Sequence, residues 1–131
     1  MQRQDYAIEG LQPPISHYTD AVRWGDLVFL SGVAASDKDG KIVGVGDARA
    51  QTRKTFDNMQ LMLDAVGATF ADILKVTIFV ADMDDREAIN EIRKEYFGES
   101  RPTSTIVEVS RFAAEGIKIE IESIVGLPQL A

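Results

Sequence analysis

The chain has 131 residues, of which 45% are hydrophobic, and this is enough for one domain over residues 1–131 with a single core. Its net charge is −7 and no run of Lys and Arg interrupts that balance, so a nucleic-acid partner is not expected, because phosphate binding draws on clustered positive charge. Cysteine is absent, which excludes disulfides and thiol chemistry, and the polar N-terminus and lack of a long apolar run predict a cytoplasmic protein without a membrane partner.

Three short strands are expected early in the chain, at 6–8, 21–24 and 27–31. Between the first and the second, Pro13-Pro14 forbids regular structure, so the loop that carries His17 and Tyr18 should be extended. These two side chains are the first polar groups of functional interest. For His17, hydrogen bonding within the loop and contact with a ligand both remain open.

A long helix is predicted next. Asp47 is a suitable N-cap, and Gly67 stands where a helix typically ends. Apolar residues at helical spacing form one stripe, which consists of Phe56, Met59, Met62, Leu63 and Val66. Because only one face is apolar, the helix should pack on a sheet through that face.

A strand and a second helix follow. The segment 70–83 predicts a strand whose buried face consists of Leu74, Val76, Ile78 and Val80. Asp84 and Glu87 have the spacing of a capping box, which predicts a helix start there. The apolar stripe of that helix consists of Ile89, Ile92 and Tyr96, and Gly98 should end it.

Two runs near the C-terminus alternate apolar and polar residues, which is the period of a half-buried strand. The linker 111–116 is short enough to bring the two runs side by side as a ribbon. In the second run, Ile119 and Ile121 share one face and Glu120 points the other way. Glu120 is therefore the first candidate for a catalytic group, and a solvated strand carboxylate is the alternative.

The order of elements predicts an α+β fold in which one sheet carries both helices on a single face. The other face would leave Ile106 and Phe79 in water, so we expect it to be a subunit interface, with scattered exposed apolar residues as the alternative. A chain with one His and no His spaced with Glu on a helix gives no reason to expect a metal site.

The order and spacing of several motifs resemble the Rid family, also called the YjgF family, of enamine and imine deaminases. The resemblance covers about 14–125, and its clearest segments are Ser31-Gly32 after an apolar run, the strand 72–80, Asn90, Pro102 and Ile119-Glu120-Ile121-Glu122. It implies a chorismate-mutase-like α+β fold and a homotrimer. It also implies that a small-molecule substrate binds in clefts between subunits, without cofactor or metal.

Carried over residue by residue, the resemblance matches Glu120 to the glutamate that handles the attacking water. It matches Tyr18 to the loop tyrosine and Asn90 to the helix asparagine. The arginine that grips the substrate carboxylate is missing, because the family's Pro-Ala-Arg-Ser motif is here Pro102-Thr103-Ser104-Thr105. A neutral serine cannot replace a bidentate guanidinium–carboxylate pair.

Two residues are considered as compensation for the missing arginine. Arg101 lies three positions before Ser104, an odd offset that places it on the opposite face unless the chain bends at Pro102. His17 is the other, as a donor or a proton carrier.

The leading hypothesis is therefore a hydrolase of a small imine, enamine or related C–N compound. In it, Glu120 handles water, while Tyr18, His17 and Ser104 shape the pocket. The alternative is a non-catalytic trimer on the same fold that binds a small ligand or another protein.

Overall fold

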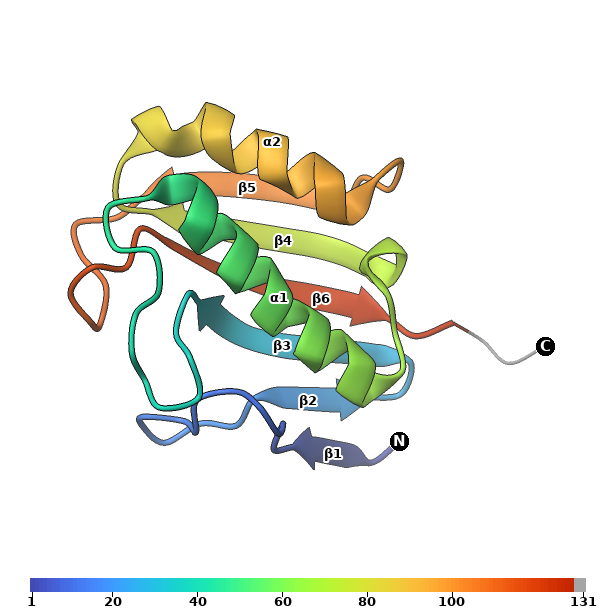
Figure 1. The fold of residues 1–131 in the computed structure, drawn as a ribbon. Coiled ribbons are helices and arrows are strands. Elements are labelled where there is room, and N and C mark those ends of the chain that lie inside the picture. Colours follow the sequence, from blue (N-terminus) through green and yellow to red (C-terminus); the bar gives the residue numbers. More distant parts are fainter. Residues whose placement is uncertain (129–131) are drawn as a thin grey trace.

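One mixed sheet of six strands runs through the molecule, and both helices lie on the same face of it (Figure 1). The computed structural model describes residues 1–128, so the last three positions of the predicted domain lie outside the described residues. The strands are β1 (Arg3–Tyr6), β2 (Ala21–Trp24), β3 (Leu27–Ala34), β4 (Ile73–Val80), β5 (Thr103–Glu108) and β6 (Ile119–Gly126). The helices are α1 (Ala48–Val66) and α2 (Arg86–Phe97), with short 3₁₀ turns η1 (Phe70–Asp72) and η2 (Met83–Asp85). The prediction of an α+β fold with one sheet and two helices is confirmed.

The caps of α1 are those that the sequence predicts. The Asp47 carboxylate accepts a hydrogen bond from the Ala50 N–H at 3.0 Å. Gly67 has φ of 76°, a left-handed conformation that favours glycine, and it ends the helix. The predicted apolar stripe is buried against the sheet.

At the N-terminus, β1 lies earlier than the predicted strand at 6–8, because its pairing with β2 ends where Tyr6 meets Ala21. No helix in residues 1–128 is long and apolar enough to cross a membrane.

The predicted C-terminal ribbon is wrong, because β5 and β6 are not neighbours. The sheet order is β1-β2-β3-β6-β4-β5, so β4 lies between them. β6 pairs antiparallel with both β3 and β4, while β5 pairs parallel with β4. A parallel pair needs a crossover, and α2 provides it between β4 and β5. The linker 111–116 therefore passes the end of β4 instead of making a hairpin.

The face assignment of β5 is also corrected. Ile106 pairs with Ile78, which is buried under the helices, so Ile106 lies on the helix face and packs against the core. Val107 points to the opposite, open face, where 37% of it is exposed. The run 104–109 has apolar residues at both parities, so its alternation could not indicate which face is inside. Phe79 does lie on the open face, half-buried, as predicted.

Two smaller corrections concern β4 and α2. The pairing of β4 with β6 shifts register between Ile73 and Lys75, which turns Leu74 outward and gives the buried position to Ile73. The predicted capping box does not form: Asp82 accepts a hydrogen bond from the Asp84 N–H at 2.9 Å and caps η2. Since η2 continues directly into α2, the helix starts without a side-chain cap of its own.

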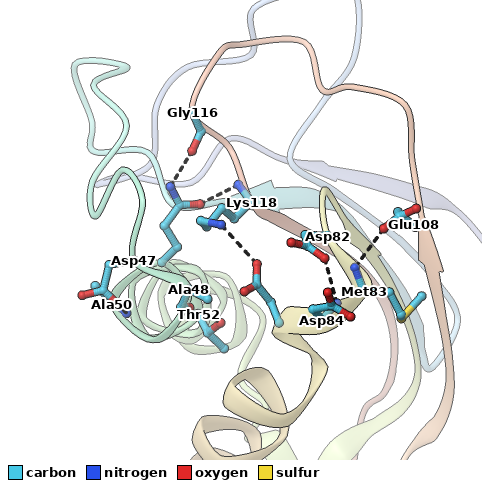
Figure 2. Close-up of polar contacts among 12 residues, drawn as sticks. Asp47, Ala48, Ala50, Thr52, Asp82, Met83, Asp84, Glu108, Gly116 and Lys118 are labelled. Atoms are coloured by element: carbon cyan, nitrogen blue, oxygen red, sulfur yellow. Dashed lines mark hydrogen bonds and ion pairs between the residues drawn. The ribbon is translucent and has the colours of Figure 1, made fainter.

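The segment that leads into β6 is held against the helix layer by hydrogen bonds at Gly116 and Lys118 (Figure 2). The Gln51 side chain donates to the Gly116 carbonyl at 2.6 Å and accepts from the Lys118 N–H at 2.8 Å. The Lys118 ammonium also pairs with Asp85 of η2 at 3.2 Å. These contacts fix the chain two residues before Glu120, so the position of that carboxylate does not depend on a free loop.

Candidate active site

Glu120 lies on the open face of the sheet, as the alternation in β6 predicts. Its neighbours Ile119 and Ile121 are fully buried on the helix face. Across the strands it pairs with Phe79 of β4 and Ala34 of β3. The side chain is half-buried and borders a cavity of about 140 Å³. A carboxylate in a cavity of this kind can reach a small molecule.

A bulge in β3 makes room for the Glu120 carboxylate. The pairing of β3 with β6 shifts register between Leu30 and Val33, which leaves Ser31-Gly32 outside the regular ladder. A Cβ placed on Gly32 would lie 3.1 Å from both Cδ and Oε1 of Glu120. A larger residue at this position would make the Glu120 carboxyl shift by a few tenths of an ångström, so glycine provides the space that the carboxyl occupies. The sequence resemblance includes Ser31-Gly32, but periodicity alone gives no sign that the glycine faces the carboxylate.

The loop before β2 contributes one of its two predicted side chains to the cavity. Tyr18 lines the cavity, and its hydroxyl accepts a hydrogen bond from the Ile15 N–H at 3.4 Å. The buried Asp20 fixes the end of the loop by accepting from the Ile8 N–H at 2.7 Å. His17 is exposed and is not among the cavity-lining residues. The structure therefore brings Tyr18 to Glu120 and leaves His17 outside.

The linker between β5 and β6 forms another wall of the cavity. Its lining residues are Phe112, Ala113, Ala114 and Ile117. The hydrogen bond from Gln51 to Gly116 holds this linker against α1. From the sequence, 111–116 is predicted only as a linker between two strands. Its apolar residues are the one feature of the sequence that indicates a cavity wall.

Burial raises the pKa of Glu120, and the neighbouring Glu122 carboxylate raises it further. Both causes disfavour the charged form, so Glu120 takes up a proton at higher pH than an ordinary glutamate. A carboxyl group tuned in this direction can accept a proton from water and return it to a leaving amine.

Among residues 1–128, no three His, Asp or Glu side chains lie together as a metal-binding set.

The remaining predicted residues lie on α2 and at the edge strand β5, where Ser104 and its partner Arg93 form a second cluster. Ser104 pairs with the buried Val76 and so points to the helix face. Its hydroxyl accepts a hydrogen bond from Nη1 of Arg93 on α2 at 2.9 Å. Asn90 is exposed one turn earlier on that helix, and Arg101 is exposed before β5 begins.

Glu120 and Ser104 therefore lie on opposite faces of the sheet within one chain. Ser104 shares a face with Val76, whereas Glu120 shares one with Phe79, three residues along the same strand. Neither Ser104 nor Asn90 lines the cavity at Glu120. A site that uses both clusters requires a second copy of the chain.

Comparison with known proteins gives consistent matches. The family model described as endoribonuclease L-PSP matches residues 10–126. A RutC family protein of Pyrococcus horikoshii is 41% identical over 117 residues, which are 88% of this chain and 91% of that protein. The 3-aminoacrylate deaminase RutC of Acinetobacter baylyi is 35% identical over 116 residues, again 88% and 91% of the two chains. The crystal structure of E. coli TdcF with bound serine has a TM-score of 0.84 at 32% identity and covers 94% of this chain and 99% of that one.

Proposed function

The chain belongs to the Rid family, the endoribonuclease L-PSP family of the matching model, and from this premise we propose that it is a deaminase of a small imine, enamine or related C–N compound. The observation that carries the proposal is the half-buried Glu120 carboxylate, which borders a cavity with Tyr18 and has space because position 32 is glycine. A related protein of the family is named a deaminase of 3-aminoacrylate, an enamine.

In the proposed reaction, water adds to the carbon of the C=N bond while Glu120 accepts its proton. The same carboxyl group then gives this proton to the nitrogen, which completes a carbinolamine. Glu120 next takes the proton of the carbinolamine hydroxyl and passes it to the amino group, and the C–N bond breaks as the C=O bond forms, which leaves a carbonyl compound and ammonia. An enamine first takes a proton on carbon to become the imine. The raised pKa of Glu120 suits both directions of proton transfer. No cofactor or metal takes part in this scheme.

We propose that the active assembly is a homotrimer with the substrate bound between subunits. Support comes from the separation of the two clusters, which one chain alone does not bring together. The open face adds to it, because it carries Trp24, Leu27, Phe29 and Val107, which are exposed large apolar residues. Light scattering at micromolar concentration should report three chains per particle, and a monomer would remove the shared cleft.

Substrate choice is expected to differ from that of family members with the Pro-Ala-Arg-Ser motif. Because Ser104 stands at the arginine's position, the substrate either lacks the usual α-carboxylate or has it held by another group. Ammonia release should be measured across a panel of imines and enamines with and without a carboxylate. Release that depends on Glu120 supports the proposal, and a panel without any release above the uncatalysed rate contradicts it.

A non-catalytic trimer that binds a small ligand or another protein is the second candidate. The serine at position 104 favours it, since a binding protein does not need the substrate-orienting arginine. The two candidates differ in one measurement: a non-catalytic protein would bind the carbonyl product in calorimetry but release no ammonia from its imine.

A further inference from the structure

Arg93 on α2 has no carboxylate partner among the described residues. The other two arginines at the contact of the helices both have one: Arg49 is paired with Glu91 at 2.7 Å, and Arg53 is paired with Glu95. The guanidinium of Arg93 instead donates one hydrogen bond to the Ser104 hydroxyl and lies 5.7 Å from the centre of the Phe97 ring. It is thus held by one neutral acceptor and one aromatic face.

This environment leaves N–H donors of the Arg93 guanidinium available to an anion. Arginine has five N–H donors in a rigid fork, and a single hydrogen bond to Ser104 leaves most of them free. The side chain is half-buried, and burial lowers the pKa of Arg93, which means that no neighbouring negative charge offsets the loss of water. The charged form would be stabilised by a carboxylate that docked on its free edge.

The position of the group connects it with the candidate site. By the resemblance to the Rid family, Ser104 stands at the position of the carboxylate-binding arginine, and its hydroxyl is in contact with the Arg93 guanidinium. Arg93 reaches the Ser104 hydroxyl from α2, one turn after Asn90. The same kind of charge is therefore present at this edge of the sheet, although it comes from α2 and not from β5.

We propose that Arg93 binds the carboxylate of the substrate, with Ser104 holding one arm of the guanidinium in place. This inference rests on the proposed function and narrows it: the substrate is a small imino or enamino acid, not a neutral imine. It also makes Ser104 a positioning residue and removes the need for Arg101 or His17 as compensation.

The first test is calorimetric binding of pyruvate, with pyruvamide as its neutral counterpart, to the intact protein and to Arg93→Gln. We expect pyruvate to bind about ten- to a hundredfold more weakly to the variant, as the loss of a bidentate charged pair requires, and pyruvamide binding to stay unchanged. Arg86→Gln, the same substitution at the start of the same helix, is the matched control and should bind like the intact protein. Equal pyruvate affinity for Arg93→Gln and the intact protein would overturn the inference.

Kinetics with 2-iminopropanoate separate this inference from the proposed function. Arg93→Gln should raise KM by a similar factor and change kcat less. If the intact protein hydrolyses the imine and Arg93→Gln has an unchanged KM, the inference fails while the deaminase function stands. If no imine is hydrolysed but pyruvate binding depends on Arg93, the inference stands and the deaminase function fails.

A relocation experiment guards against a merely structural effect of the substitution. In the double variant Arg93→Gln/Ser104→Arg, the guanidinium moves from α2 to β5 and should restore much of the lost pyruvate affinity. Ser104→Ala alone should weaken pyruvate binding by only a few-fold, because the guanidinium remains but is less well held. A loss in Arg101→Gln as large as that expected for Arg93→Gln would assign the role to Arg101 and overturn the proposal.

Discussion

The cavity at Glu120 and the cluster at Arg93 differ in what positions them. At the cavity, a strand bulge, a glycine and a fastened linker together determine where the carboxylate lies, so the backbone itself is involved. At the edge of the sheet, Arg93 and Ser104 meet through side chains alone, on a regular helix and a regular strand. The first region can lose its chemistry through small backbone shifts, whereas the second can exchange one binding group for another without them. A protein can therefore keep a proton-transfer group and change how its substrate is held.

The sharpest way to break this comparison is Glu120→Gln, which keeps the shape of the side chain and removes the base. We expect turnover to fall by roughly 10²–10⁴-fold, the usual contribution of general acid–base catalysis. Steady-state ammonia release on the best substrate of the panel is the measurement. Glu122→Gln is the control, because Glu122 lies two residues on along the same face without bordering the cavity. An equal loss in both variants would mean that the charge of the strand matters and not one placed carboxylate.

The stability of Glu120→Gln follows from the direction of the pKa shift. A raised pKa in the folded protein means that the ionised carboxylate disfavours the fold, and this cost appears as pH rises from the ordinary glutamate value through the raised one. Removing the charge should therefore leave Tm unchanged or slightly higher at pH 7. The difference should vanish at pH below about 4, where both states are protonated. A clear loss of Tm at neutral pH would assign Glu120 a structural role.

A smaller effect is expected from Gly32→Ala, which tests whether the bulge positions the carboxylate. Gly32 has no positive φ, so alanine brings no backbone strain, and its Cβ would press on the Glu120 carboxyl at 3.1 Å. A shift of a few tenths of an ångström should lower kcat by roughly tenfold, given that a misplacement of 1 Å can cost about a hundredfold. If kcat and Tm are both unchanged, the cavity tolerates the displaced Glu120 carboxyl. The position of Glu120 would then depend less on the backbone than proposed.

The smallest expected effect concerns the acidic limb of the pH–rate profile. Glu122 contributes to the raised pKa of Glu120, so Glu122→Gln should move that limb to lower pH while leaving the maximal rate nearly unchanged. The pH dependence of kcat for the intact protein and the variant gives the answer. A shift to higher pH would contradict the assigned direction of the interaction.

Local signals predicted the individual elements well but not their arrangement. The Asp47 and Gly67 caps and the alternation around Glu120 depend on neighbours in sequence, and the structure agrees with them. The prediction that β5 and β6 are neighbours was wrong, because a short linker can form a hairpin or can pass across the end of another strand. The prediction that Ile106 lies on the open face was wrong, because the run 104–109 has apolar residues on both sides of the strand.

Arg93 was missed for a related reason. Its contact with Phe97 at i, i+4 is readable from helical spacing, and so is its place on the same side as Asn90 at i, i+3. Its contact with Ser104 depends on how α2 lies over β5, which no local pattern specifies. The resemblance identifies position 104 as the one that lacks an arginine, but it does not indicate an arginine on α2.

The central position of β6 has a consequence for how the molecule is made. The strands β1 to β3 and the pair β4–β5 can each associate without it, but only as two separate sheets with open edges at β3 and β4. The pairing of β6 with β3 joins segments that are far apart in the sequence, and such non-local pairing slows folding. Until β6 is in place, the edges of β3 and β4 remain available to other chains. During synthesis, the sheet can therefore close only after β6 has left the ribosome. Since β6 also carries Glu120, the strand that completes the fold is the one that delivers its reactive group.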